Sequence, residues 1–298
     1  MDSIQSLNHH NHLHHHQEKL HHHKDDFHQI KYHQIERNLR MKKIKFEYLF
    51  LILLMVISST RGQSSSLCPS MCSCIWRNGK QTANCERQGL IAIPTGITSS
   101  TQVLNVSGNN FQILPSRVFQ ERGLINLQKI FLSECKLGEI AKDAFVQLTN
   151  LVELDLSYNL LTSVPSTALS ECPSLRRLLL NSNPIRVIKS DAFHQLSSLV
   201  FLDLSSSQLD LIEPHAFRGL TKLQFLKLES NRLQILSPQV VIDLPALYSL
   251  DLHQNQWNCD CELKPAREWM IRNNVPQSIP PTCTTPKRLA GKQIQSSH

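Results

Sequence analysis

Aromatic residues and charges are scarce in this chain, at 6% and 18% of its 298 residues, and neither glycine nor proline is in excess. With 41% hydrophobic residues, this composition excludes a disordered or collagen-like chain and favours a globular one. The formal net charge is +7, but no lysine and arginine cluster marks a nucleic-acid footprint. We therefore expect no nucleic-acid partner.

The apolar run Tyr48–Ile57 is too short to span a bilayer, which takes about 20 residues. Lysines at 42, 43 and 45 precede it, and small residues at Thr60 and Gly62 follow it. A basic flank, an apolar centre and small residues are the parts of a secretory signal peptide. We predict such a signal over residues 42–62 and a chain in the secretory pathway, extracellular or at the cell surface. An uncleaved anchor is the alternative.

Histidine is distributed unevenly, since eleven of the fifteen histidines lie in residues 1–40. Tracts of this kind can bind metals. The alternative, which we favour, is a low-complexity extension over residues 1–41 that precedes the targeting signal. We expect no metal and no cofactor in the protein.

Cysteine is nearly missing from the middle of the chain and gathers at two places instead. Four of the nine cysteines lie between Cys68 and Cys85, and three lie between Cys259 and Cys283. Such clusters favour disulfides and an oxidising compartment. A zinc site at Cys72 and Cys74 is disfavoured, because one intervening residue suits zinc poorly and no histidine is near.

A repeat of the form L-x-x-L-x-L-x-x-N-x-L fills the region between the two cysteine clusters. Its spacing is 24 residues after a first step of 26, and its central residues are Leu104, Ile130, Leu154, Leu178, Leu202, Leu226 and Leu250. Fixed periods of this length indicate a solenoid. We predict an α/β leucine-rich-repeat solenoid, with seven repeats over residues 100–256 and a curved parallel sheet on its concave face.

Polar residues at the end of each predicted strand should bond the buried backbone of the turn. Asparagine fills this position in five repeats, at 109, 159, 183, 231 and 255. Cys135 fills it in the second repeat, where we expect a buried free thiol, and Ser207 in the fifth, where we expect the least well bonded turn. Phenylalanines at 119, 145, 193 and 217 recur once per repeat and are expected in the core.

The two cysteine clusters resemble the flanking modules of extracellular leucine-rich-repeat proteins, an N-terminal cap over residues 63–99 and a C-terminal cap over residues 257–298. The resemblance implies the disulfides Cys68–Cys74, Cys72–Cys85 and Cys259–Cys283. In that family a fourth cysteine completes the C-terminal module, so Cys261 is expected to lack its partner and the cap to be incomplete. A truncated chain and a short secreted form linked through Cys261 are the two explanations. Cys172 is expected to be an inert thiol.

Four strings are similar to the kekkon family of insect leucine-rich-repeat membrane proteins: Cys74–Lys80, Thr101–Leu104, Asn126–Ile130 and Arg267–Met270. The resemblance implies an immunoglobulin domain, a membrane-spanning helix and a cytoplasmic tail, with a role in modulating growth-factor-type receptor signalling. This chain stops before those parts, so we expect membrane tethering only if a longer form exists.

Because side chains alternate along a strand, one set of them lies on the concave face, where a partner would bind. Phe201 and Phe225 fall on neighbouring strands there, about 4.8 Å apart. We predict a patch that binds an extracellular or cell-surface protein, made of Phe131, Leu179, Phe201, Phe225, Arg177, Asp155 and Asp203. The alternative is that these large side chains only cover the sheet or favour strand formation.

The one Asn-x-Ser/Thr sequence, at Asn105, predicts a glycan at one end of this face. No catalytic set can be assembled, because His194, His215 and His253 fall on separate turns. We therefore expect no enzyme, but an extracellular protein-binding module that is the ectodomain part of a receptor or of a modulator of receptor signalling. A secreted structural protein of the extracellular matrix is the alternative.

Overall fold

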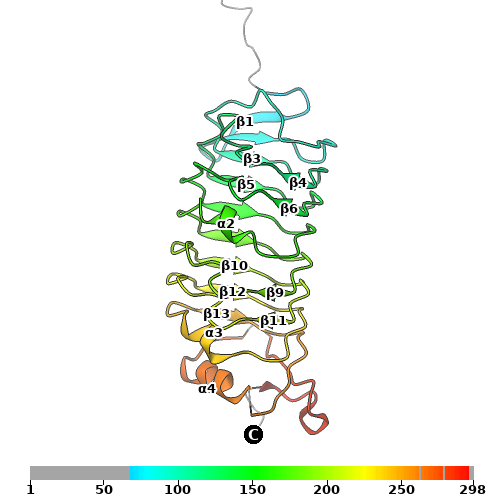
Figure 1. Ribbon diagram of the computed structural model, residues 1–298, viewed down its shortest axis with the longest axis vertical. Helices are drawn as coiled ribbons and strands as arrows, with labels where there is room; N and C mark the ends of the chain where they lie inside the picture. Colours follow the sequence, from blue (N-terminus) through cyan, green and yellow to red (C-terminus); the bar gives the residue numbers. More distant parts are fainter. Residues whose placement is uncertain (1–67, 262, 278, 295–298) are drawn as a thin grey trace, which may run out of the picture. The chain divides into compact units, whose positions relative to one another are not determined.

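The computed structural model describes residues 68–261, 263–277 and 279–294. The expected His-rich extension (1–41) and signal peptide (42–62) lie outside the described residues. The described residues form a stack of turns that share a nine-stranded sheet on one side (Figure 1). This confirms the predicted solenoid.

Seven strands of this sheet come from the repeats and pair in parallel, one turn to the next. Each is three residues long: β3 (Val103–Asn105), β5 (Lys129–Phe131), β7 (Glu153–Asp155), β8 (Arg177–Leu179), β10 (Phe201–Asp203), β12 (Phe225–Lys227) and β13 (Ser249–Asp251). The central leucine or isoleucine of every strand is buried, and the residues on either side of it face outward on the concave face. The predicted strand positions are therefore confirmed.

An antiparallel hairpin closes the N-terminal end of the stack. Its strands β1 (Ser73–Arg77) and β2 (Lys80–Asn84) are joined by Asn78 and Gly79, both with positive φ, as a two-residue hairpin turn requires. Strand β2 then pairs in parallel with β3. Disulfides join Cys68 to Cys74 and Cys72 to Cys85, the pairs that the resemblance implies.

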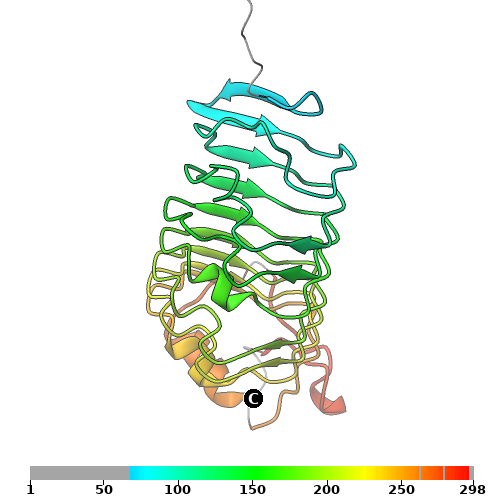
Figure 2. The same cartoon turned by 45° about the horizontal axis from the view of Figure 1, so that its top comes forward.

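The return half of each turn lies opposite the large sheet (Figure 2). Short parallel strands form there between β4 (Ile113–Leu114) and β6 (Glu139–Ile140), and between β9 (Val187–Ile188) and β11 (Leu211–Ile212). Two turns carry short helices instead, α2 (Ser166–Leu169) and α3 (Pro238–Ile242).

The phenylalanines of the return half are buried and stack in two pairs. The ring centroids of Phe119 and Phe145 are 6.0 Å apart, and those of Phe193 and Phe217 are 5.9 Å apart. Leu169, which lies in α2, follows Phe145 by one repeat of 24 residues and separates the two pairs. The repeats that lack the phenylalanine are therefore the ones that form helices, since Val241 holds the same position in α3.

A helix and a disulfide-bonded loop cover the C-terminal end. Helix α4 (Lys264–Arg272) buries Ala266 and Met270, one turn apart, and lies beside α3. Trp257 is 1% exposed, and its Nε1 donates a hydrogen bond to the carbonyl of Leu252 at 2.9 Å. The Cys259–Cys283 disulfide and the 3-10 helix η1 (Lys287–Leu289) also lie in this C-terminal region.

Buried asparagines bond one turn to the next, as their spacing predicts. In the third repeat, Asn159 Oδ1 accepts hydrogen bonds from the backbone N–H of Cys135 (2.9 Å) and of Leu137 (3.0 Å). Its Nδ2 donates to the carbonyls of Leu132 (2.8 Å) and Leu156 (2.9 Å). The side chain thus satisfies polar backbone in two turns that no water reaches.

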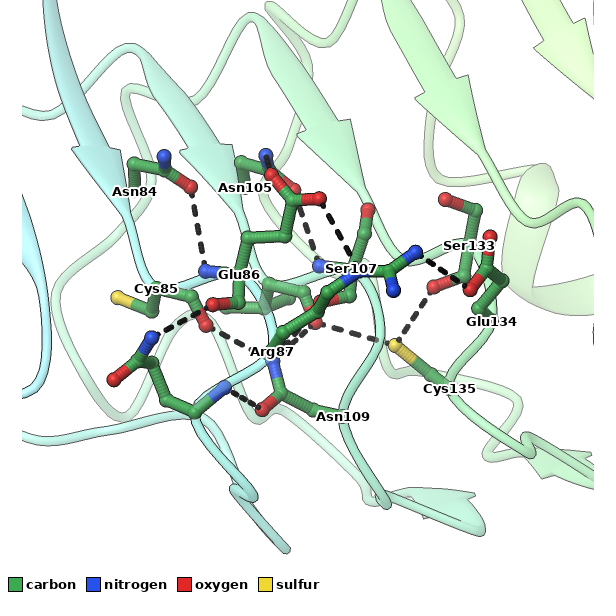
Figure 3. Close-up of polar contacts among 12 residues, drawn as sticks. Asn84, Cys85, Glu86, Arg87, Asn105, Ser107, Asn109, Ser133, Glu134 and Cys135 are labelled. Atoms are coloured by element: carbon green, nitrogen blue, oxygen red, sulfur yellow. Dashed lines mark hydrogen bonds and ion pairs between the residues drawn. The ribbon is translucent and has the colours of Figure 1, made fainter.

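We call the column of buried asparagines, one per repeat, the asparagine ladder. The two residues that replace asparagine in it form different hydrogen bonds. The thiol of Cys135 still reaches the preceding turn, with Sγ 3.2 Å from the carbonyl oxygen of Val106 (Figure 3). The hydroxyl of Ser207 reaches only Ser205, at 3.5 Å, within its own turn. The carbonyl of Leu180 consequently accepts a side-chain hydrogen bond from Asn183 alone. The carbonyl of Leu156, in contrast, accepts one from Asn159 and one from Asn183.

Candidate protein-binding surface

The concave face is a grid in which rows are strands and columns run along the solenoid. The first column joins the leading residues of the strands in direct register, so that Arg177, Phe201, Phe225 and Ser249 are successive neighbours. The second column joins Leu179, Asp203, Lys227 and Asp251 in the same way. These outward residues are half-buried, apart from Asp251, which is buried.

Four side chains make one continuous line, which we call the aromatic stripe: Arg177, Phe201, Phe225 and Tyr248. The Arg177 Cζ lies 3.9 Å from the ring centroid of Phe201. The Phe201 and Phe225 centroids are 6.2 Å apart, and Tyr248 meets Phe225 edge-on at 5.7 Å. The stripe thus crosses four consecutive turns.

Tyr248 is the member of the stripe that sequence analysis missed. It lies one residue before β13 and two before the buried Leu250, so strand alternation assigns it to the inward side. It is nevertheless 63% exposed, because the strand begins only after it and its ring turns onto Phe225. The sequence feature that could have indicated this contact is a tyrosine one turn after an outward phenylalanine.

Charged side chains extend the first column toward the N-terminal end. Glu153 is bridged on both sides, with its carboxylate 2.7 Å from Lys129 Nζ and 3.4 Å from Arg177 Nε. Arg177 therefore contacts an acid on one neighbouring strand and an aromatic ring on the other. These contacts restrict the rotamers of Arg177 and hold it over Phe201.

Of two apolar residues in the expected patch, one lies beside the stripe and the other lies apart from it. Leu179 faces outward on β8, two residues after Arg177, and borders the stripe. Phe131 lies on β5, which β7 and β8 separate from the strand of Phe201. The structure therefore brings Leu179 to the stripe and leaves Phe131 apart from it.

The two expected aspartates are hydrogen-bonded by serines of their own turns. Asp155 Oδ1 accepts from the Ser157 backbone N–H at 2.9 Å and from the Ser157 hydroxyl at 2.6 Å. Asp203 Oδ1 accepts in the same way from Ser205, at 3.0 and 2.6 Å. Each aspartate therefore shapes the end of its strand, and one oxygen of each carboxylate remains for a ligand.

Asn105, the expected glycan acceptor, faces outward at the N-terminal end of the grid. Its Oδ1 accepts from the backbone N–H of Ser107 at 3.1 Å, and its Nδ2 donates to Glu86 at 3.2 Å (Figure 3). Glu86 is exposed, so its bond yields readily to an attached sugar. Glycosylation of Asn105 stays a prediction.

The free thiols have environments that suppress their reactivity, with one exception. Burial raises the pKa of the Cys135 thiol to about 11 and that of the Cys172 thiol to about 12. Both therefore stay protonated and lack the thiolate that nucleophilic chemistry requires. Cys261, in contrast, is exposed. Within residues 68–261, 263–277 and 279–294, no group of His, Cys, Asp and Glu side chains is arranged to hold a metal ion.

Comparison with known proteins identifies the repeats. The sequence profile of the family described as Leucine rich repeat matches residues 125–185, 173–233 and 212–256. These turns are leucine-rich repeats. The profile covers the strands that carry the aromatic stripe, and the leucine-rich repeats of such solenoids act as protein-interaction modules.

Relatives of these leucine-rich repeats include human chondroadherin-like protein, 33% identical over 36% of this chain and 14% of its own length. Trophoblast glycoprotein of Macaca fascicularis is 33% identical over 31% of this chain and 22% of its own length. The matches thus span less than a quarter of these two relatives.

Solved structures match over a larger part of the chain. The crystal structure of human 5T4 (Wnt-activated inhibitory factor 1, trophoblast glycoprotein) superposes with a TM-score of 0.59 and 29% identity, over 78% of this chain and 97% of that one. The structure of a TLR13–ssRNA13 complex matches with a TM-score of 0.52 and 29% identity, over 55% of this chain and 23% of that one. These leucine-rich repeats, with their disulfide-bonded ends, form an interaction module of the extracellular type.

None of the helices in the described part of the chain is long and apolar enough to cross a membrane. The expected signal peptide and the secretory route rest on residues outside that part and stay predictions.

Proposed function

We propose that this protein binds an extracellular or cell-surface protein through the aromatic stripe on the concave face of its leucine-rich repeats. The observation that carries the proposal is the ring-to-ring contact of Phe201, Phe225 and Tyr248, capped by Arg177, on a solvent-facing sheet. Aromatic and arginine side chains are the residues that dominate protein interfaces.

Folding does not require aromatic side chains at the positions of the stripe. The core is complete beneath it, since the leucines at the strand centres are buried whatever the outward residues are. Elsewhere on the face the outward positions are mainly polar, as in Asn105, Glu153 and Asp155. An apolar line that runs across several turns therefore fits recognition better than folding.

The finer role follows from the resemblance to the kekkon family and is part of the proposal: an ectodomain portion that captures a receptor or ligand and so modulates growth-factor-type signalling. A structural protein of the extracellular matrix is the competing function. The two differ in the class of protein bound, which is a receptor or soluble ligand in the first and a matrix component in the second.

The test is a binding screen of the full secreted chain against a panel of cell-displayed receptors, soluble ligands and matrix proteins. Each partner found is then measured with the double variant Phe201→Ser/Phe225→Ser. We expect the affinity to fall by about a hundredfold or more, because truncating central aromatic residues typically costs at least 2 kcal/mol each. Secretion should remain normal, since both rings are only half-buried.

Phe131→Ser is the matched control, because it removes an aromatic ring from the same face at a position apart from the stripe. We expect it to bind as the unmodified chain does. A double variant that keeps full affinity would overturn the proposed surface, and partners drawn only from matrix proteins would favour the structural function.

A further inference from the structure

Three acidic residues neighbour one lysine at the C-terminal end of the concave face, and we call this group the acidic end. Lys227 is the direct sheet neighbour of Asp203 on one side and of Asp251 on the other. Glu229 follows Lys227 by two residues, and its Oε1 lies 3.6 Å from Lys227 Nζ. One resident cation therefore faces three acids.

Two of these acids hold oxygen atoms that are buried without a hydrogen-bond partner. They are Glu229 Oε2 and Asp251 Oδ1, and Asp251 as a whole is only 9% exposed. A buried carboxylate without compensating donors is unfavourable, and native structures rarely keep one unless it serves a function. Burial and the charges of Asp203 and Asp251 accordingly raise the pKa of the Glu229 carboxyl.

The acidic end is still accessible from the solvent side. Asp203 is half-buried, and the side chains of Lys227 and Glu229 are 37% and 14% exposed. An approaching donor can therefore reach Asp203 and Glu229, whereas Asp251 is buried and contributes its negative charge from beneath the surface. Phe225 leads the same strand as Lys227, so the acidic end is continuous with the aromatic stripe.

We propose that the acidic end binds a lysine or arginine side chain of the protein partner, while the apolar residues beside that side chain pack on Phe225 and Tyr248. This inference rests on the proposed function of the stripe and adds the chemistry of the partner to it. A second cation would compensate the acids that Lys227 leaves unpaired, and its hydrogen bonds to carboxylates would be charge-assisted.

Charge complementarity selects this partner over an anionic one. The structure of a TLR13–ssRNA13 complex, one of the similar proteins, shows that such a solenoid can hold RNA. At the acidic end of this chain, the phosphates of a nucleic acid would lie against three acidic residues, and like charges opposite one another weaken a complex. The basic partner is therefore the one that the charges favour.

The experiment uses the full secreted chain and a phage-displayed library of random peptides as the probe. We expect the enriched peptides to carry lysine or arginine next to aromatic or branched apolar residues. Their affinity should fall at least about tenfold for Glu229→Gln/Asp251→Asn. The control is Glu121→Gln, which removes a charge from an exposed side chain outside the strands of the large sheet. It should change the affinity less than about twofold.

Two further measurements separate this inference from the proposed function. Peptides that bind Phe201→Ser/Phe225→Ser weakly but Glu229→Gln/Asp251→Asn normally would uphold the stripe and overturn the acidic end. Peptides that lose affinity with neither variant, or a library that yields no binder, would count against both. If the acid variant does not fold, the same peptides with each basic residue replaced by glutamine decide the question on the unmodified chain, because undiminished binding would overturn the inference.

Discussion

The guanidinium group of Arg177 lies over the ring of Phe201, with Cζ 3.9 Å from the ring centroid, while Nε of the same side chain lies 3.4 Å from Glu153. Arg177 thus links the charged and aromatic halves of one column on the concave face. It also covers part of an aromatic surface that would otherwise face water.

Replacing Arg177 with glutamine should lower the free energy of unfolding only slightly. The arginine side chain is 43% exposed, and a cation–π contact at such a site contributes about 0.5–1 kcal/mol. Chemical denaturation measures the change. Arg176→Gln, one residue earlier and exposed, is the control and should have no measurable effect. Equal effects of the two variants would show that the contact with Phe201 contributes nothing to stability.

Replacing Ser207 with asparagine should stabilise the protein by about 1 kcal/mol, the net contribution of a typical hydrogen bond. The asparagine amide can donate to the Leu180 carbonyl, which lacks the second donor that the corresponding Leu156 carbonyl has. The midpoint of denaturant unfolding is the measurement, with Ser207→Ala as the control. An asparagine variant less stable than the unmodified chain would mean that this turn has no room for the amide.

Replacing Asn159 with alanine should destabilise the protein by about 3 kcal/mol, because each buried polar group left without a partner costs roughly 1–3 kcal/mol. The variant leaves the N–H groups of Cys135 and Leu137 without their acceptor. Asn181→Ala is the matched control, since that side chain is half-exposed on the concave face. Similar unfolding midpoints for the two variants would contradict the role of the ladder.

The free thiols should differ sharply in their reaction with iodoacetamide near pH 8, where an ordinary cysteine is partly ionised. Cys135 and Cys172 remain protonated there, because burial raises the pKa of their thiols to about 11 and about 12. Cys261 is exposed and should be alkylated in the folded protein. Peptide mass spectrometry identifies the labelled sites, and alkylation in denaturant should reach all three. Rapid labelling of Cys135 in the folded protein would contradict its burial.

The Glu229→Gln variant should gain stability over the unmodified chain at neutral pH and not at acidic pH. Burial is the main cause that raises the pKa of Glu229 in the folded protein, so its protonated form is the one that folding favours. That stability is present below the pKa of an unfolded glutamate and is lost as the pH rises through the raised value. Glutamine resembles the protonated form at every pH, which is why the gain appears only above that range.

Thermal unfolding of both proteins between about pH 4 and pH 8 measures this difference. The charged and titratable groups around Glu229 are Lys227 two residues before it, Asp203 and Asp251 on the strands that flank β12, and His253 in the next turn. Glu171→Gln, a change at an acid outside this group, is the control and should leave the pH profile unaltered. Parallel profiles for Glu229→Gln and the unmodified chain would contradict the raised pKa.

The repeat period alone was sufficient to predict the fold. A leucine-based spacing of 24 residues fixes which side chains point inward, and inward leucines can be buried only if the turns stack. The strand positions, the asparagine ladder and the outward position of Phe201 and Phe225 follow from this pattern. The bonds of Asp155 and Asp203 to serines were also within reach of the sequence, since an aspartate two residues before a serine favours them.

The composition of the site was decided by the tertiary structure. Tyr248 joins the stripe because its strand begins one residue later, which frees its ring to turn outward, and Phe131 is left out because two strands intervene. The burial of Glu229 and Asp251 depends on the side chains of neighbouring turns. A repeat pattern specifies each turn by its own residues, whereas contacts and desolvation between turns depend on side chains that pack together only after the turns have stacked.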